Sequence, residues 1–212
     1  MTPLILGIVA AGLYGIEKLD RKMEPDPKIK RALLSAGLAC GGLIRWILGP
    51  EQAAERILLA LVMGCLLLGC VTDVLTCQVY NFVWWLGGVA AAVLLWRRLW
   101  TAGGAGMWVL AELAAFWAIQ LGVFSRLYGK ADCYGFCVCA AAAAGLGMNL
   151  REMALHMAFA FCLLLPVQCI NRNVTKTGKL KKPVPFLPYL TAGFGLILIF
   201  VKICGETVVP QL

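Results

Sequence analysis

Two aspartates stand out in the sequence, because each is a single acid at the junction between two apolar segments. Asp73 follows the apolar run 57–70 and precedes the run 82–96. Asp132 lies in a similar position: the apolar segment 103–124 ends before it, and the segment 132–148 begins with it. A carboxylate at the edge of hydrocarbon is costly to keep ionised and rarely lacks a partner or a function. Each of the two acids is therefore a candidate partner for the other.

A pair of neighbouring carboxylates has a definite chemistry. Two such groups cannot both ionise easily, so one keeps a proton and the other becomes a base. The pair can then activate a water molecule and protonate a leaving nitrogen, which is the chemistry of peptide hydrolysis. It titrates as a unit, so neither role is assigned to one residue. The alternative is two unrelated interfacial acids, each hydrated or paired with a nearby Lys or Arg, and spacing alone leaves both open.

The composition indicates which elements must position these acids. The chain has 212 residues, of which 61% are hydrophobic and 14% charged, and its mean hydropathy is +0.84. A soluble domain of this size cannot bury so much apolar surface, whereas a bilayer takes up about 20 apolar residues per helix. We therefore predict an all-α, polytopic transmembrane bundle of about eight helices. The expected apolar segments are 2–16, 32–49, 57–72, 79–96, 103–124, 132–148, 152–170 and 186–203.

The distribution of basic residues predicts the orientation of this bundle. The net charge of +8 would suggest nucleic acid for a soluble protein, but here it indicates basic loops facing anionic lipid. No nucleic-acid partner is therefore expected. Thirteen of the nineteen Lys and Arg residues fall in the odd-numbered loops, mostly in 17–31 and 171–185. The positive-inside rule then puts both acids at the cytoplasmic membrane face, at similar depth.

The remaining chemistry-bearing residues give weaker signals. The ten cysteines form no CxxC pair and lie in or beside apolar runs, as expected for small packing residues. The single histidine, His156, is expected at the membrane interface, so neither a metal site nor a cofactor is predicted. Glu112 lies inside an expected span and is a further candidate for function. The alanine run 140–144 predicts a face on which another helix approaches closely.

Three short motifs occur in a fixed order around the two acids. They are Asp73 followed by Val79-Tyr80-Asn81, then Gly129-Lys130-Ala131-Asp132, then Pro185-Phe186-Leu187-Pro188-Tyr189 with Ala192-Gly193 behind it. This ordered set, over residues 55 to 203, resembles the type IV prepilin leader peptidases, which are GxGD-type intramembrane aspartyl peptidases. Archaeal preflagellin peptidases and, more distantly, presenilin are relatives of that family. The chain departs from its pattern at Tyr80, where a proline is usual, and at Ala131, where a second glycine is usual.

The resemblance implies a function and a set of site residues. Asp73 and Asp132 would be the catalytic pair of a membrane aspartyl endopeptidase, which cleaves the leader from prepilin or pseudopilin-like proteins of a pilus or secretion system. The active site would face the cytoplasm from the cell (plasma or inner) membrane. Supporting residues would be Asn81, Gly129, Lys130, Ala131, Pro185, Phe186 and Pro188. The chain would be a short form without the cytoplasmic CxxC domain linked to N-methylation, so we expect peptidase activity, and whether N-methylation also occurs is left open.

Two other functions are consistent with the same residues. A proton-coupled transporter could use the intramembrane acids as proton sites, although the inverted repeats and broken helices of that class are not evident. A non-catalytic membrane protein of pilus assembly would bind prepilin without cleaving it. We expect one membrane domain over 1–212, with N-terminal helices and a basic loop in 1–54 and the peptidase core in 55–205; the oligomeric state is left open.

Overall fold

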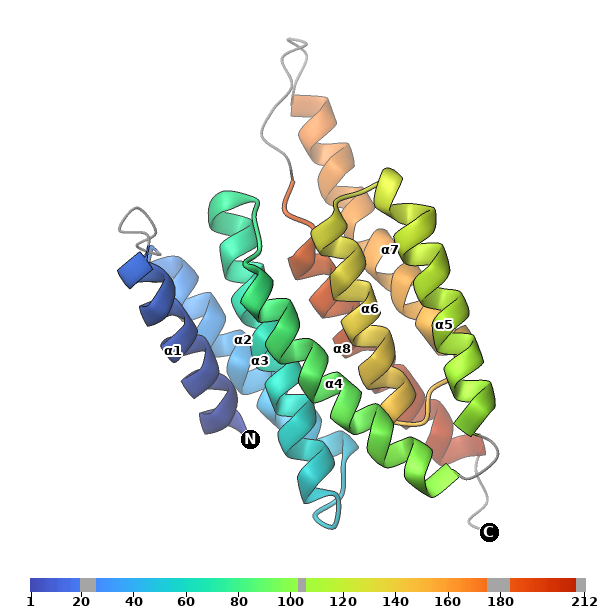
Figure 1. Cartoon of the computed structure of the whole chain (residues 1–212). Coiled ribbons are helices and arrows are strands. Elements are labelled where there is room, and N and C mark those ends of the chain that lie inside the picture. The colour runs from blue at the N-terminus through green and yellow to red at the C-terminus, as the bar shows by residue number, and fades with distance from the viewer. Residues whose placement is uncertain (20–25, 103–105, 175–183, 209–212) are drawn as a thin grey trace.

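The computed structural model describes residues 1–19, 26–102, 106–174 and 184–208 (Figure 1). Within these ranges the chain is helical and contains no strand, so the predicted all-α fold is confirmed. Each of the eight expected apolar segments corresponds to one α-helix. The elements are α1 (Thr2–Leu19), α2 (Pro27–Ile47), α3 (Ala53–Thr76), α4 (Asn81–Ala102), α5 (Gly106–Gly122), the short 3-10 helix η2 (Phe124–Arg126), α6 (Lys130–Gly145), α7 (Leu150–Val174) and α8 (Leu187–Val208).

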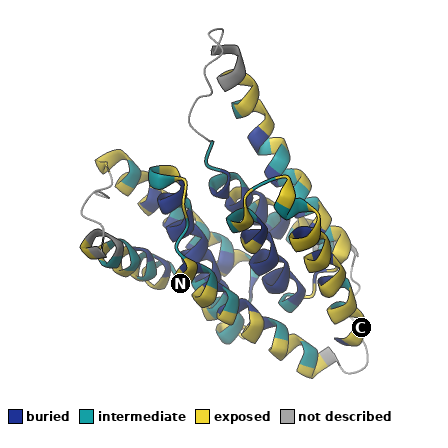
Figure 2. Cartoon of the chain, turned by 45° about the horizontal axis from the view of Figure 1, so that its top comes forward, coloured by how far each residue is buried: buried dark blue, intermediate teal, exposed yellow. Residues whose placement is uncertain are grey.

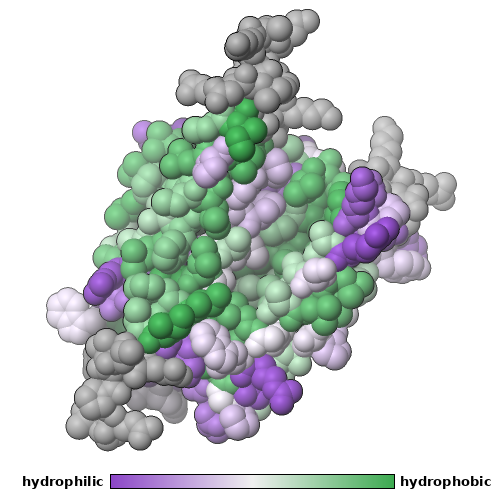
Figure 3. Space-filling view, turned by 180° about the vertical axis from the view of Figure 1, so that it is seen from behind, coloured by the Kyte–Doolittle hydropathy of each residue, from purple (hydrophilic) through white to green (hydrophobic). Residues whose placement is uncertain are grey.

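Five of the helices in the described part of the chain are long and apolar enough to cross a membrane, namely α3, α4, α5, α7 and α8. This is three fewer than the eight apolar segments. The apolar part of α1 covers only Thr2–Gly15, and α6 has 16 residues. Helix α2 begins with the basic residues Lys28, Lys30 and Arg31, which make it too polar. Hydrophobic side chains cover most of the face in Figure 3, and hydrophilic ones gather toward its ends.

Helices α3 and α6 form the centre of the bundle. Helix α3 packs against α1, α2, α4 and α8, and α6 packs against α4, α5, α7 and α8. The buried residues accordingly gather along the inner helices, while α5 and α7 expose much of their surface (Figure 2). Nearly the whole of α6 from Cys133 to Ala144 is buried. A helix that is apolar all round and too short to span a membrane is stable in such a protein-lined position.

The alanine run on α6 brings two helices into close contact, as the small side chains predict. Residues 140–144 are all buried, and α6 runs along α4. At the end of this face, a β-carbon added to Gly145 would lie 2.7 Å from the carbonyl carbon of Leu94 and 2.8 Å from the nitrogen of Leu95. Only hydrogen fits there, because the neighbouring atoms are backbone.

Helix α3 extends one turn further than the apolar pattern predicts. Asp73 was expected in the loop after the helix, but it lies in the last turn of α3, which ends at Thr76. The Thr76 hydroxyl donates to the carbonyl of Thr72 at 2.7 Å, so the polar side chains of this turn are satisfied within the helix. Cys77 ends the helix in the left-handed conformation, with φ of 53°, and its N–H donates to the Asp73 carbonyl. The extension places the Asp73 side chain inside the bundle rather than in a loop.

Part of the basic-residue pattern lies outside the described residues. Arg21, Lys22 and the lysines of 175–183 belong to that part. Lys28, Lys30 and Arg31 begin α2, where they are exposed. The Asp26 side chain caps this helix by accepting the N–H of Lys28 at 2.8 Å.

Candidate functional site

The two aspartates line one cavity of about 640 Å³. It lies where α3 ends and α6 begins, and η2, α7 and the segment before α8 complete it. Its size is within the range of small-molecule and peptide pockets. The lining residues are Asp73, Cys77, Phe124, Leu127, Tyr128, Gly129, Asp132, Phe161, Leu164, Leu165, Gln168, Val184 and Phe186.

Asp73 is held by the N-terminus of α8. Its Oδ2 accepts the N–H of Leu187 at 2.9 Å, and the side chain is 8% exposed. The first N–H groups of a helix have no partner within that helix, and a carboxylate is a favourable acceptor for them. Pro188 follows directly and is tolerated in a first helical turn, so the Pro185–Tyr189 motif both starts α8 and presents this donor. The Asp73 carboxylate is thereby oriented by a backbone group that lies 114 residues away in the sequence.

Asp132 lies in the first turn of α6, two residues after the helix begins. A carboxylate is favourable at this position because of the positive end of the helix dipole. Gly129 precedes the helix with φ of −60° and ψ of 145°, which any residue can adopt. Its role is space, since a β-carbon there would lie 3.1 Å from Oδ2 of Asp132. The glycine therefore leaves room for the carboxylate.

The acids lie close enough to interact electrostatically with each other. Neither of them forms an ion pair with a described residue, and no Lys, Arg or His is among the residues that line the cavity. The sequence had left open that each acid is paired with a nearby cation, and this is not found in the described part of the chain. Asp73 and Asp132 therefore line the same cavity, with no cation among its described lining residues.

Aromatic side chains form the wall beneath the acids. The Tyr128 ring contacts those of Phe124, Phe136, Phe161 and Phe186, with centroids 5.5 to 6.0 Å apart. Its hydroxyl donates to Oε1 of the buried Gln120. Burial raises the pKa of Tyr128, so the phenol stays neutral and remains a donor. The packed rings therefore form one aromatic side of the cavity, to which Phe124, Tyr128, Phe161 and Phe186 contribute.

The structure brings together four of the nine site residues that the sequence singled out, namely Asp73, Gly129, Asp132 and Phe186. The others do not line the cavity. Asn81 and Lys130 are the exposed first residues of α4 and α6, and Ala131 and Pro185 adjoin the lining residues in sequence. Pro188 lines a separate apolar groove that α2, α3 and α8 border.

The departures from the family pattern are structurally mild. Ala131 lies in the helix α6 and therefore has a negative φ. Alanine adopts this conformation without the steric cost that it would have at positive φ, where glycine is favoured. Tyr80 lies just before α4, and its carbonyl accepts the N–H of Val83 at 3.0 Å. The backbone of this turn therefore closes without the usual proline.

Two polar residues outside the acid pair have structural roles. Glu112 accepts the N–H of Leu150 at 2.9 Å and so caps the start of α7. The expectation for His156 was wrong, because it is 2% exposed and its Nε2 lies 3.0 Å from the Leu190 carbonyl. It lies between the rings of Phe136 and Phe194 in the core.

Sequence reasoning missed the contribution of α7, which supplies Phe161, Leu164, Leu165 and Gln168 to the cavity. Gln168 is the one of these with a visible signal, since it is a polar residue inside an expected apolar segment. The three apolar residues cannot be distinguished by sequence from lipid-facing positions of the same helix.

The left-handed residue that ends α3 gives a testable prediction about stability. Cys77→Gly is expected to stabilise the protein by roughly 0.5–1 kcal/mol, because glycine adopts positive φ without the steric cost of a side chain. Cys169→Gly is the control, since Cys169 is an exposed residue inside α7 and glycine there is destabilising by a similar amount. Thermal unfolding in detergent measures both. Equal shifts of the midpoint in the same direction would contradict the assigned backbone conformation.

Comparison with known proteins adds no relative: no protein-family model, curated protein or solved structure matches this chain.

Proposed function

We propose that the chain is a membrane aspartyl endopeptidase that removes the leader peptide from type IV prepilin-like proteins. The observation that carries this proposal is that Asp73 and Asp132, from helices far apart in sequence, line one cavity with no cation among its described lining residues. The order of the three motifs around these acids supports the same family. The third motif supports it further, because its Leu187 N–H contacts Asp73.

The proposed reaction uses the carboxylates as one unit. One carboxylate takes a proton from a water molecule, whose oxygen attacks the carbonyl carbon of the scissile peptide bond. The protonated partner hydrogen-bonds the carbonyl oxygen, and collapse of the tetrahedral intermediate delivers a proton to the leaving nitrogen. The Leu187 N–H keeps the Asp73 carboxylate oriented throughout. No metal or cofactor is needed for this chemistry.

The apolar lining suggests how substrate would be held. Leu127, Leu164 and Leu165 lie around the acids together with the aromatic wall. Such a surface would bind the apolar part of the substrate. The acids lie at the end of the bundle, where the polar leader would approach from the water. Under the positive-inside rule this end lies on the cytoplasmic side of the cell membrane.

Co-expression with a candidate prepilin tests the proposal. We expect the substrate to shift to the mobility of the mature form only when the chain is present. A substrate that stays intact but co-purifies with the chain would indicate the non-catalytic assembly protein. Acid-dependent solute uptake by liposomes, without any cleavage, would indicate a proton-coupled transporter that uses the same two carboxylates.

A further inference from the structure

Another cavity, of about 710 Å³ and lined in part by charged residues, lies at the opposite end of the bundle from the acid pair. Glu55 lines it near the start of α3, whereas Asp73 lies near the end of that helix. Eighteen residues at 1.5 Å per residue separate the two by about 27 Å. The cavity therefore has no part in the site described above. It is lined by Leu48, Gln52, Glu55, Leu94, Trp96, Arg97, Arg98, Trp100, Thr101, Gly145 and Leu146.

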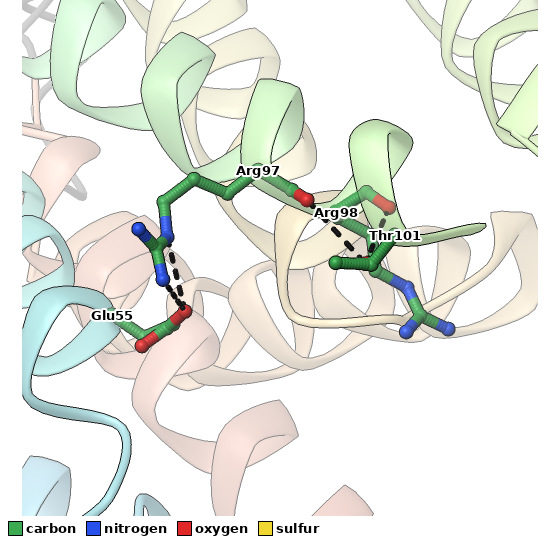
Figure 4. Close-up of polar contacts among 4 residues, drawn as sticks. All are labelled: Glu55, Arg97, Arg98 and Thr101. Atoms are coloured by element: carbon green, nitrogen blue, oxygen red, sulfur yellow. Dashed lines mark hydrogen bonds and ion pairs between the residues drawn. The ribbon is translucent and has the colours of Figure 1, made fainter. Parts of the chain in front are cut away.

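The two arginines of this cavity differ in their partners (Figure 4). Arg97 donates to Oε1 of Glu55 from Nε at 3.1 Å and from Nη2 at 2.8 Å. The Thr101 hydroxyl donates back to its own helix, to the carbonyl of Arg98 at 2.9 Å. The guanidinium of Arg98 has no hydrogen-bond or ion-pair partner among the described residues, and Figure 4 shows it directed away from Glu55. One charged, five-donor group is thus left for an external acceptor.

A further donor lies in the same cavity. The side-chain oxygen of Gln52 accepts the N–H of Gly49 at 3.0 Å, so its amide NH₂ remains available to donate. Glu55 offsets the charge of Arg97, and the lining therefore carries one net positive charge, from Arg98. A planar guanidinium matches the oxygens of a phosphate group, which it can bind in a bidentate manner, and the Gln52 amide is a second donor on the lining of the same cavity.

The tryptophans place the cavity at a definite depth. Trp96 and Trp100 line it, are 63% and 79% exposed, and have ring centroids 6.0 Å apart. Exposed tryptophans at the end of a membrane-spanning helix lie at the level of lipid headgroups. Under the expected orientation this end faces away from the cytoplasm. An arginine at headgroup level can bind the phosphate of an anionic lipid there through charge-assisted hydrogen bonds.

We propose that this cavity binds a phosphoester anion, with the headgroup of an anionic phospholipid as its source. Arg98 and the Gln52 amide hold the phosphate, and Trp96 and Trp100 lie against the glycerol and the upper acyl chains. Glu55 limits the affinity, because it occupies Arg97 and repels an anion. The site is independent of the acid pair, so it stands whether or not the chain is a peptidase.

Thermal unfolding in nanodiscs tests this site. Nanodiscs of phosphatidylcholine alone are compared with nanodiscs that also contain phosphatidylglycerol, and native mass spectrometry counts the phosphatidylglycerol retained. We expect phosphatidylglycerol to raise the unfolding midpoint. Arg98→Gln should require about tenfold more phosphatidylglycerol for the same shift, as expected for the loss of one charge-assisted contact. Arg98→Lys should weaken the phosphatidylglycerol effect less, because lysine keeps the positive charge but lacks the planar guanidinium that binds phosphate through two hydrogen bonds.

Two further variants separate a site from general attraction to anionic lipid. Glu55→Gln frees Arg97 and should strengthen the phosphatidylglycerol effect, a gain that loss of folding cannot imitate. Arg151→Gln removes an exposed charge at the same end, outside the cavity, and should behave like the unchanged protein. An equal response of Arg98→Gln and Arg151→Gln would overturn the proposal.

A second experiment, with a soluble phosphoester in place of the lipid, identifies the source of the phosphate. Glycerol phosphate is added to the protein in phosphatidylcholine nanodiscs, and the same midpoints are measured. A shift that depends on Arg98 here, without one from phosphatidylglycerol, supports the phosphoester site with a soluble source and overturns the lipid headgroup as the ligand. No Arg98-dependent shift in either arm overturns the whole proposal.

Discussion

Asp73→Asn and Asp132→Asn are each expected to abolish leader cleavage, with a loss on the order of 10³-fold or more. Neither amide can take a proton from water or share one with its partner. Because the proposed mechanism uses the two acids as a unit, the double variant should be no worse than either single variant. Cleavage of a co-expressed prepilin, followed by immunoblotting of membranes, measures the loss.

The structure allows a matched control for these variants. Asn at position 73 keeps an oxygen that can accept the N–H of Leu187, so α8 should still begin where it does. Asp26→Asn makes the same chemical change at the cap of α2, where Asn is as good a cap as Asp, and should leave cleavage intact. Normal cleavage by either active-site variant would remove the acid pair from the mechanism.

Gly145→Ala is expected to destabilise the protein by about 1–3 kcal/mol, the usual cost of overpacking. The added β-carbon would lie 2.7 Å from the carbonyl carbon of Leu94, and backbone atoms cannot rotate away as a side chain can. Helices α4 and α6 would have to separate at this end. Unfolding in mild detergent, followed by tryptophan fluorescence, measures the change.

Gly88→Ala provides the comparison, because it makes the same change on α4 where no atom lies within 4 Å of the new carbon. There alanine should be neutral or stabilising by up to about 1 kcal/mol, owing to its better helix propensity. If both variants lost the same stability, close approach of α4 and α6 would not be the cause.

Much of the fold was predictable, because apolar segments and overall composition reflect the need of each helix to bury its apolar side chains in the bundle or in lipid. All eight apolar segments became helices, and the alanine run at 140–144 marked the buried α4–α6 contact. The end of α3 was not predictable, because Thr72 and Thr76 are polar residues that satisfy their hydroxyls within the helix. The role of α6 as a buried core helix depends on which neighbours surround it, and a sequence pattern does not record that.

The candidate site was predictable at its acids and less so around them. Asp73 and Asp132 were recognisable because a lone acid at a hydrophobic junction is costly. The contact between Asp73 and Leu187 joins residues 114 apart, which no local pattern specifies. His156 was misplaced for a related reason: its carbonyl partner, on Leu190, comes from another helix, and burial became affordable only through that bond.

Hydrolysis of a prepilin by the purified protein is the most direct test of the proposed peptidase activity. The protein, reconstituted in liposomes, is incubated with a purified prepilin in ¹⁸O-labelled water, and the products are identified by mass spectrometry. We expect one cut at the leader junction, one ¹⁸O atom in the new carboxylate of the leader, and no product from Asp73→Asn or Asp132→Asn. An intact prepilin with the unchanged protein, or labelled product from either variant, would contradict the proposal.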